Sequence, residues 1–286
     1  MVSIKGVCTR RLVTGVLPAV TAGVALGAFS LAGSASGAQQ EAATSRPGQP
    51  TIVLEHGAFA DASSWNGVVG ELRRDGYPVV AAANPLRGPA YDAAALRGVL
   101  DHVKGPKIVV GHSYGGNVIS AAATDDPQVK ALVYVAAFLP APGESALELT
   151  DKYPGSTLSD TLDPVPYTLP DGTTGTDLYI QQDKYRHQFA ADVPRATADL
   201  AAATQRPVAQ AALEEKATSA AWKHKPVWDI VTTQDLNIPP AVQRYMARRA
   251  HAHTTEVAAS HAVAVSHPHR VADVIEQAAT GSVTAS

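Results

Sequence analysis

The strongest constraint on the fold is a regular alternation of short apolar segments with stretches whose apolar residues have helical spacing. The strand candidates lie at residues 51–55, 78–82, 107–110, 129–137, 227–232 and 254–257, and all but the last are mainly apolar. The helical stretches between and after them lie at 63–74, 91–103, 115–123, 239–250 and 268–279. Strands that alternate with helices are typical of a mostly parallel β-sheet covered by helices on both faces. The sequence therefore predicts an α/β fold.

The segment at about residues 139–224 interrupts this alternation. It is rich in Pro, Gly, Asp and Thr, lacks strand signals, and is strongly helical only near 178–189 and 194–217. We interpret it as a helical insertion between two strands rather than a separate domain. Open parallel sheets bind ligands at the carboxyl ends of their strands. We therefore expect a cap over such a site, with a variable surface excursion as the alternative.

The first 38 residues have the organisation of a secretory signal peptide. Basic residues, including Arg10 and Arg11, precede a long uncharged stretch rich in Val, Ala, Leu and Gly, and small residues at 34–38 close it. We expect cleavage after Ala38 and a secreted protein without stable membrane association. A retained membrane anchor is the alternative. The Arg10-Arg11 pair is compatible with twin-arginine export.

Composition narrows the class of the remaining chain. Residues 39–50 are polar and predict a flexible leader, and 51–286 predict one folded domain with the insertion inside it. With 45% hydrophobic residues, disorder is not expected, and the single cysteine, Cys8, excludes a disulfide framework. No extended basic run is present and the net charge is −3, so nucleic acid is not an expected partner.

The motif Gly111-His112-Ser113-Tyr114-Gly115 lies between an apolar strand segment and a helix of small residues. This context is typical of a nucleophile elbow, in which a serine occupies a tight, strained turn and its hydroxyl projects from the sheet. The small residues two positions before and after the serine permit the close packing that the turn needs. Ser113 is therefore the candidate nucleophile.

A serine nucleophile needs a histidine base and a carboxylate that orients it, in the chain order Ser, Asp or Glu, His. Asp235 follows the apolar segment 227–232 and is the candidate acid, whereas Asp229 falls inside that segment. His261 follows the last strand and is the candidate base. Of the other histidines, His251 and His253 precede the last strand and His267 and His269 lie further along the chain. His56 precedes the serine, contrary to the expected order.

The developing oxyanion needs two hydrogen-bond donors. We expect one to be the backbone N–H of Tyr114, the residue after the nucleophile. The other should come from the loop at 56–59, where Gly57 permits close approach, with Ala58 as the first choice and Phe59 as the second. His56 precedes the serine and is interpreted as a residue that fixes this loop. The His-x-His pairs at 251–253 and 267–269 lack companion ligands, so we expect no metal and no cofactor.

These motifs resemble the α/β-hydrolase superfamily over nearly all of the chain after residue 38, and within it the small bacterial serine esterases related to the plant methyl esterase and hydroxynitrile lyase group. The matching segments are His56-Gly57-Ala58-Phe59 with Trp65 downstream, Gly111-His112-Ser113-Tyr114-Gly115-Gly116, Asp235-Leu236-Asn237-Ile238-Pro239, and Ser260-His261-Ala262-Val263-Ala264-Val265-Ser266-His267-Pro268. The resemblance implies a triad of Ser113, Asp235 and His261 beneath a helical cap.

Two departures from related families bear on the expected reaction. The hydroxynitrile lyases of the group carry a lysine directly after the catalytic histidine, where this chain has Ala262. Haloalkane dehalogenases use an aspartate nucleophile, where this chain has Ser113. We therefore expect a serine hydrolase that cleaves a small-molecule carboxylic ester through an acyl-enzyme. The alternatives are a lactone, amide or C–C bond hydrolase or a perhydrolase with the same triad, and a non-catalytic ligand-binding protein on the same fold.

Overall fold

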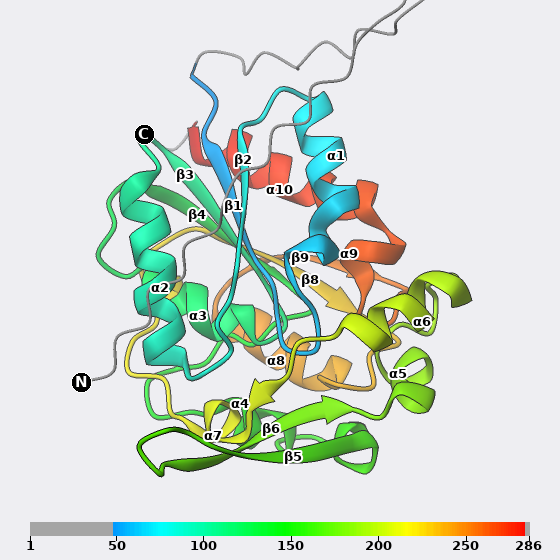
Figure 1. Cartoon of the computed structure of the whole chain (residues 1–286). Helices are drawn as coiled ribbons and strands as arrows, with labels where there is room; N and C mark the ends of the chain where they lie inside the picture. Colours follow the sequence, from blue (N-terminus) through cyan, green and yellow to red (C-terminus); the bar gives the residue numbers. More distant parts are fainter. Residues whose placement is uncertain (1–47, 284–286) are drawn as a thin grey trace, which may run out of the picture. The chain divides into compact units, whose positions relative to one another are not determined.

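A computed structural model describes residues 48–283, so the expected signal peptide and most of the expected leader lie outside the described residues. Within this range a central sheet has the strand order β2-β1-β3-β4-β8-β9, with every neighbouring pair parallel (Figure 1). The strands are β1 Thr51–Glu55, β2 Val79–Ala82, β3 Lys107–His112, β4 Val129–Val135, β8 Val227–Thr232 and β9 His253–Val257. Each of them overlaps one predicted strand, so the α/β prediction is confirmed.

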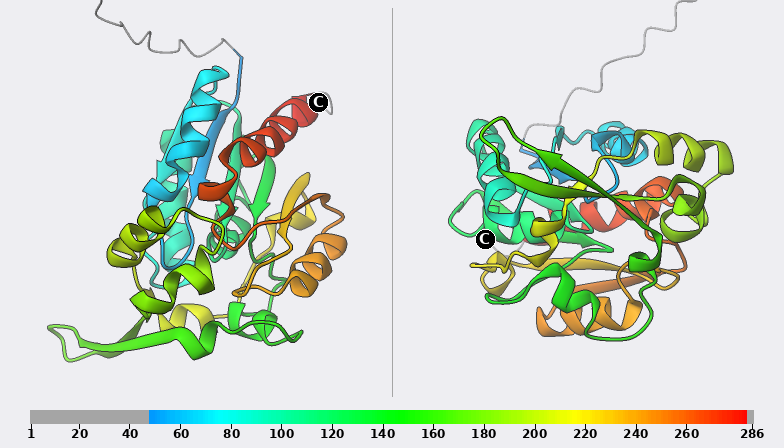
Figure 2. Two further views of the ribbon diagram at one scale, coloured as in Figure 1. Left: turned by 90° about the vertical axis from the view of Figure 1, so that its right-hand side faces the viewer. Right: turned by 60° about the horizontal axis from the view of Figure 1, so that its bottom comes forward.

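Helices cover both faces of the sheet because successive strand residues point to opposite faces. Val53 and Val109 pack in one core with α2 (Pro89–His102), α3 (Gly115–Ala122) and α8 (Pro240–Arg249). Their neighbours Ile52 and Ile108 pack in a second core with α1 (Asn66–Arg74), α9 (Val263–Ser266) and α10 (Pro268–Val283) (Figures 1 and 2). No helix within residues 48–283 is long and apolar enough to cross a membrane.

The strand order places a topological switch point between β1 and β3. From β1 the chain moves outward to β2, then returns to the other side of β1 and continues through β3, β4, β8 and β9. Loops that leave the carboxyl ends of β1 and β3 therefore diverge and leave a crevice between them, which is where open α/β sheets bind ligands. The loop at 56–59 and Ser113 both lie at this point.

The insertion between β4 and β8 lies at the carboxyl end of the sheet, at the bottom of Figure 1. It contains four helices, α4 Ala146–Thr150, α5 Gln182–Phe189, α6 Arg195–Thr204 and α7 Gln210–Glu214. Short 3₁₀ turns accompany them at Leu158–Thr161 and Ala221–Lys223, and another, at Ala62–Trp65, precedes α1. The insertion thus lies at the end of the sheet where we expected a cap.

The prediction that the cap is helical is correct only in part. Strands β5 (Leu162–Thr168), β6 (Thr174–Ile180) and β7 (Val208–Ala209) form an antiparallel sheet in the cap, in the order β5-β6-β7. Pro164 and Pro166 argue against a strand in the sequence, because proline has no backbone N–H to donate. β5 is an edge strand, however, where a missing N–H is tolerated. β7, which follows Pro207, likewise interrupts the helix expected at 194–217.

Candidate active site

Ser113 occupies a strained turn between β3 and α3. Its φ is 54°, in the left-handed region that residues with side chains rarely adopt. The turn is held because the Ser113 N–H donates to Val135 O (3.2 Å), while the Ser113 carbonyl accepts from the N–H groups of Gly116 (3.0 Å) and Phe138 (3.1 Å). The predicted nucleophile-elbow geometry is therefore present, and β4 supports it from the side.

The glycines on either side of Ser113 allow this turn to close. A Cβ on Gly111 would lie 2.7 Å from the carbonyl oxygen of Gly115, and a Cβ on Gly115 would lie 2.7 Å from the carbonyl oxygen of Glu55. Both distances are shorter than a carbon and an oxygen tolerate. The motif therefore needs glycine at both positions because the backbone of α3 packs directly against β3 and β1.

The carboxylate of Asp235 is buried and fully engaged in the loop after β8. Its Oδ1 accepts from the backbone N–H groups of Asn237 (2.8 Å) and Ile238 (3.0 Å). Its Oδ2 accepts from the Thr232 hydroxyl (2.9 Å) and from Gln243 Nε2 (2.9 Å) on α8. Thr232 and Gln243 were not found from the sequence; the available signal was a polar Gln243 next to Val242 on the buried face of α8.

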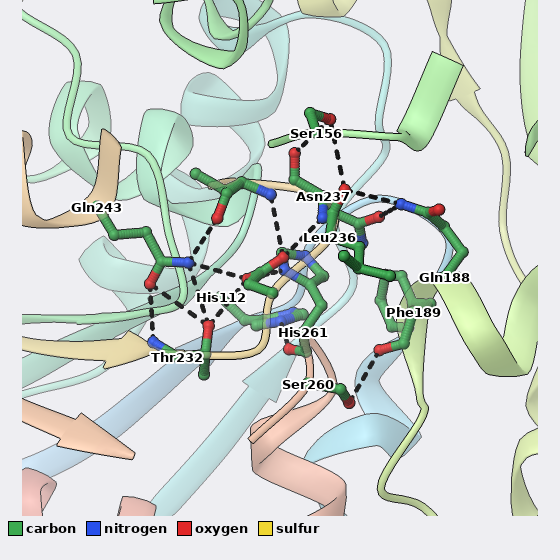
Figure 3. Close-up of polar contacts among 12 residues, drawn as sticks. His112, Ser156, Gln188, Phe189, Thr232, Leu236, Asn237, Gln243, Ser260 and His261 are labelled. Atoms are coloured by element: carbon green, nitrogen blue, oxygen red, sulfur yellow. Dashed lines mark hydrogen bonds and ion pairs between the residues drawn. The ribbon is translucent and has the colours of Figure 1, made fainter. Parts of the chain in front are cut away.

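His261, in the loop after β9, completes this set of contacts. Its Nδ1–H donates to Asp235 Oδ2 at 2.7 Å, and Figure 3 shows Thr232, Gln243 and His261 gathered around this group. Burial by itself raises the pKa of the Asp235 carboxyl, but the charge and hydrogen bond of His261 and the two amide N–H groups outweigh it and hold that pKa below its usual value. Because Nδ1 carries the proton, Nε2 of His261 is the atom that can act as a base.

His112, directly before Ser113, supports His261 from the other side. Its Nε2–H donates to the carbonyl oxygen of His261 at 2.9 Å, and the two rings lie 4.8 Å apart. Burial, helped by the neighbouring His261, lowers the pKa of His112 to about 3, so the ring is neutral. The end of β3 and the histidine loop are thereby joined by a hydrogen bond that sequence reasoning did not predict.

Two backbone N–H groups are available near Ser113. Among the hydrogen bonds of residues 48–283, the N–H of Phe59 donates to the carbonyl oxygen of Arg206 in the cap (3.0 Å), whereas none uses the N–H of Ala58 or Tyr114. A Cβ on Gly57 would lie 2.6 Å from Ser113 Cβ, so the loop after β1 passes directly beside the serine. The geometry thus favours Ala58 over Phe59 as the partner of Tyr114.

A pocket of about 130 Å³ brings the candidate residues together beneath the cap. Ser113, His261, Ala58 and Tyr114 all line it. The apolar residues that line it come from both the core and the cap, and they are Phe59, Phe138, Ala146, Leu147, Leu158, Leu162, Leu213 and Ile238. The polar ones are Thr150, Asp151, Ser156, Ser159 and Asn237. The site is therefore a largely apolar pocket that includes a serine and a histidine in its lining.

His56 lies outside this pocket and holds two loops together. Its ring Nε2 accepts the N–H of Asn84 (3.0 Å), and its carbonyl oxygen accepts from the Asn84 side chain (2.8 Å). Burial is the main reason why the pKa of His56 is lowered, which leaves the ring nitrogen free to accept. The interpretation of His56 as a loop-fixing residue is confirmed.

The other candidates considered from the sequence are not brought to the site. Asp229 is buried inside β8, its Oδ2 has no hydrogen-bond partner among the described residues, and burial raises its pKa well above the usual value. His253 stacks on Trp228 at the opposite end of β9 (4.7 Å), and His269 faces Asp273 on α10 (3.4 Å). Within residues 48–283 no group of three or more His, Cys, Asp or Glu side chains could hold a metal ion.

The fold and this arrangement of residues agree with a family match. The model of the alpha/beta hydrolase family matches residues 52–274, which is most of the chain. The chain therefore belongs to the alpha/beta hydrolase family.

One curated relative is similar to part of the chain. A carbendazim hydrolyzing esterase from Nocardioides sp. (strain SG-4G) is 31% identical over 114 residues, covering 35% of this chain and 47% of the relative. The chain thus spans about half the length of this curated relative.

Solved structures share the fold over nearly their whole length. A pyrethroid hydrolase from Sphingobium faniae JZ-2 has 24% identity and a TM-score of 0.67, covering 82% of this chain and 99% of that one. Polyneuridine aldehyde esterase has 19% identity and a TM-score of 0.70, covering 80% and 98%. A methylesterase from Arabidopsis has 17% identity and a TM-score of 0.68, covering 81% and 99%. The predicted relationship to the plant methyl esterase group is confirmed at the level of fold.

Proposed function

We propose that this protein is a serine hydrolase that cleaves carboxylic esters, with Ser113 as nucleophile, His261 as base and Asp235 as the orienting acid. One observation carries the proposal: Ser113 and His261 line the same pocket, and His261 Nδ1 is bonded to the buried carboxylate of Asp235. The esterases and hydrolases among the relatives support the same class. A pure binding protein would have no need of such a histidine–carboxylate pair.

The first half of the proposed reaction forms an acyl-enzyme. His261 Nε2 takes the proton of the Ser113 hydroxyl as its oxygen attacks the ester carbonyl carbon. The carbonyl oxygen becomes an oxyanion, which accepts hydrogen bonds from the N–H groups of Ala58 and Tyr114. As the carbonyl re-forms, the C–O bond to the alcohol breaks, and the protonated His261 gives its proton to the leaving oxygen.

The second half uses water in the same way. His261 Nε2 takes a proton from water as the water oxygen attacks the acyl carbon on Ser113. The bond between the acyl carbon and the Ser113 oxygen then breaks, the serine regains its proton from His261, and the carboxylic acid leaves. Asp235 stays ionised throughout and stabilises the imidazolium, which is consistent with its lowered pKa.

The pocket suggests the size and polarity of the substrate. Its volume of about 130 Å³ is close to the roughly 150 Å³ of a cavity that accepts a benzene-sized molecule. Its walls are mostly apolar, from Phe59 and Phe138 on the core side to Leu158 and Leu213 on the cap side. We therefore propose a small or medium-sized ester with an apolar acyl or alcohol group.

We also propose that the protein acts outside the cell after removal of residues 1–38. The support is the basic start, the apolar middle and the small residues at 34–38. Expression of the full chain in a bacterial host, followed by N-terminal sequencing of the exported protein, tests this. Cleavage near Ala38 with the product in the medium is expected, and an uncleaved protein held in the membrane fraction would contradict it.

A panel of p-nitrophenyl esters of rising acyl length, run beside lactones and amides, tests the proposed reaction. We expect ester hydrolysis whose kcat/KM falls as the acyl chain lengthens, because the pocket is small. Ser113→Ala should lose activity by about 10⁴-fold or more, whereas the control Ser64→Ala, outside the pocket, should retain it. Ester cleavage that survives in Ser113→Ala, or a preference for lactones or amides, would contradict the proposal.

A further inference from the structure

The carboxyl-terminal end of α5 in the cap contacts both loops that carry the proposed acid and base. Gln188 Nε2 donates to the carbonyl oxygen of Leu236 (2.9 Å) and to Asn237 Oδ1 (2.7 Å), in the loop that contains Asp235. The next residue, Phe189, turns to the other loop (Figure 3). Two adjacent cap residues thus reach loops that come from different strands, β8 and β9.

The contacts of Phe189 lie on both sides of His261. Its carbonyl oxygen accepts from the N–H of Ala262 (3.0 Å) and from the Ser260 hydroxyl (3.3 Å). Its ring packs edge-on against the His261 ring, with centroids 4.9 Å apart. The position of the histidine loop therefore depends on the same end of α5 that holds the acid loop.

The orientation of the Gln188 side chain is fixed by its partners. The Leu236 carbonyl can only accept, so the nitrogen of the Gln188 amide must face the acid loop. The Thr157 hydroxyl, also in the cap, donates to Gln188 Oε1 at 2.8 Å and thereby satisfies the other end. The side chain is only 1% exposed, so water cannot replace these bonds.

The acid loop is held from two directions. On the core side, Gln243 and Thr232 bind the Asp235 carboxylate directly. On the cap side, Gln188 binds the two residues that follow Asp235, and the Ser156 hydroxyl donates to the Asn237 carbonyl (2.9 Å). Gln188 itself is not among the residues that line the substrate pocket.

We propose that Gln188 is a positioning residue of the active site, which sets the acid loop so that Asp235 meets Nδ1 of His261. This inference rests on the proposed function, because it assigns Gln188 a part in that same triad. In this role the carboxyl-terminal end of α5 fixes the positions of the acid and base loops, in addition to forming part of the cap. Loss of the Gln188 hydrogen bonds lowers turnover, because a misplacement of catalytic groups by about 1 Å lowers the rate by about 100-fold.

The test compares two substitutions of the same type in the cap. Gln188→Met preserves volume and removes the bonds to the acid loop. Gln205→Met is the matched control, because the Gln205 amide makes three hydrogen bonds of 2.8–2.9 Å that stay within the cap, to Ile180 and Ala202. Rates are measured per active site titrated with a fluorophosphonate, so that an unfolded fraction does not lower them.

We expect Gln188→Met to lose about 10- to 100-fold in kcat, with KM changed by no more than about twofold. The acid limb of kcat/KM should move to lower pH, because a base whose carboxylate partner is displaced is protonated less readily. Gln205→Met should keep the wild-type kcat and the wild-type acid limb. If Gln188→Met does not fold, Gln188→Leu, which also lacks the amide that binds the acid loop, is expected to show the same shift.

Two results would overturn the positioning role. One is a wild-type kcat in Gln188→Met, and the other is a reduced kcat with an unmoved acid limb, as for a residue that only stabilises the cap. Failure of the proposed function is distinguishable from both, because wild-type protein would then show no site that a fluorophosphonate titrates.

Discussion

His261 and Asp235 are joined by a 2.7 Å hydrogen bond between Nδ1 and Oδ2, although they lie in different loops and are 26 residues apart in the chain. Both side chains are buried. Four further donors, two backbone N–H groups, Thr232 and Gln243, bind the same carboxylate. Because its other partners come from the loop, β8 and α8, the carboxylate is held in place independently of the histidine.

Asp235→Asn should reduce kcat by about 10⁴-fold while the protein stays folded. The amide keeps the size of the carboxylate but cannot stabilise the imidazolium or select the Nδ1–H tautomer. The comparison is made by kcat per folded molecule, with circular dichroism to establish the fold. Asp229→Asn is the matched control, since Asp229 is buried inside β8, does not line the pocket, and has a pKa raised by that burial. A large loss of activity in Asp229→Asn instead would mean that the wrong aspartate has been assigned.

Gly57→Ala should reduce kcat by about 100-fold or more, because the loop after β1 passes so close to the nucleophile. The new methyl group would lie 2.6 Å from Ser113 Cβ and 2.8 Å from the His112 carbonyl oxygen, so the serine or the loop must move. Gly70→Ala on α1 is the control, because nothing lies within 4 Å of its Cβ position. The measurement is the steady-state kcat of both variants. An equal kcat in Gly57→Ala and Gly70→Ala would contradict the proposal that the loop after β1 forms part of the oxyanion site.

Glu55→Gln should make the stability of the protein less dependent on pH between 5 and 8. Burial, together with the charge of Asp92, raises the pKa of Glu55 to about 8 from 4.5. In that window the folded protein keeps a proton that the unfolded chain releases, so the free energy of unfolding falls as pH rises, by about 1.4 kcal/mol per pH unit. Urea unfolding at pH 5, 6.5 and 8 should show the variant gaining over wild type as pH rises. If the free energies of unfolding of wild type and variant changed equally with pH, Glu55 would not be buried and protonated as argued.

His112→Gln should make the free energy of unfolding less dependent on pH below 6.5. The effect of His112 has the opposite sign to that of Glu55, because His112 destabilises the folded protein as pH falls. Burial, chiefly, lowers the pKa of His112 to about 3 from 6.5, so below pH 6.5 the unfolded chain takes up a proton that the folded protein refuses. The wild-type free energy of unfolding therefore falls as pH falls from 6.5 toward 3, by about 1.4 kcal/mol per pH unit. Unfolding measured at pH 4, 5, 6 and 7 should show a smaller slope for the variant. An unchanged slope would mean that His112 takes up a proton in the fold.

The strands and the candidate triad could be predicted because each has a local signature. A strand buried on both faces, such as β3 or β8, is a largely apolar run, and Ser113 and Asp235 follow these two runs at the carboxyl end. His261 follows the last strand, β9, which is mostly polar. The order of the three along the chain then limits the choice of acid and base.

The supporting residues could not be predicted because their partners come from distant elements. Gln243 on α8 and Gln188 on α5 are ordinary polar residues in the sequence, and only the fold brings both of them to the loop of Asp235. The cap sheet escaped prediction for a related reason. β5 is mostly exposed and contains two prolines, so its pairing with β6 leaves no apolar pattern.

Mass-spectrometric mapping of a fluorophosphonate adduct determines whether Ser113 is the nucleophile. The folded protein is treated with the reagent, digested, and compared with Ser113→Ala and with wild-type protein that has been unfolded first. We predict one phosphonyl group on the peptide that contains Ser113, absent from the variant and from the unfolded sample. An unlabelled Ser113 in folded protein, or an adduct of equal yield on another serine, would contradict it.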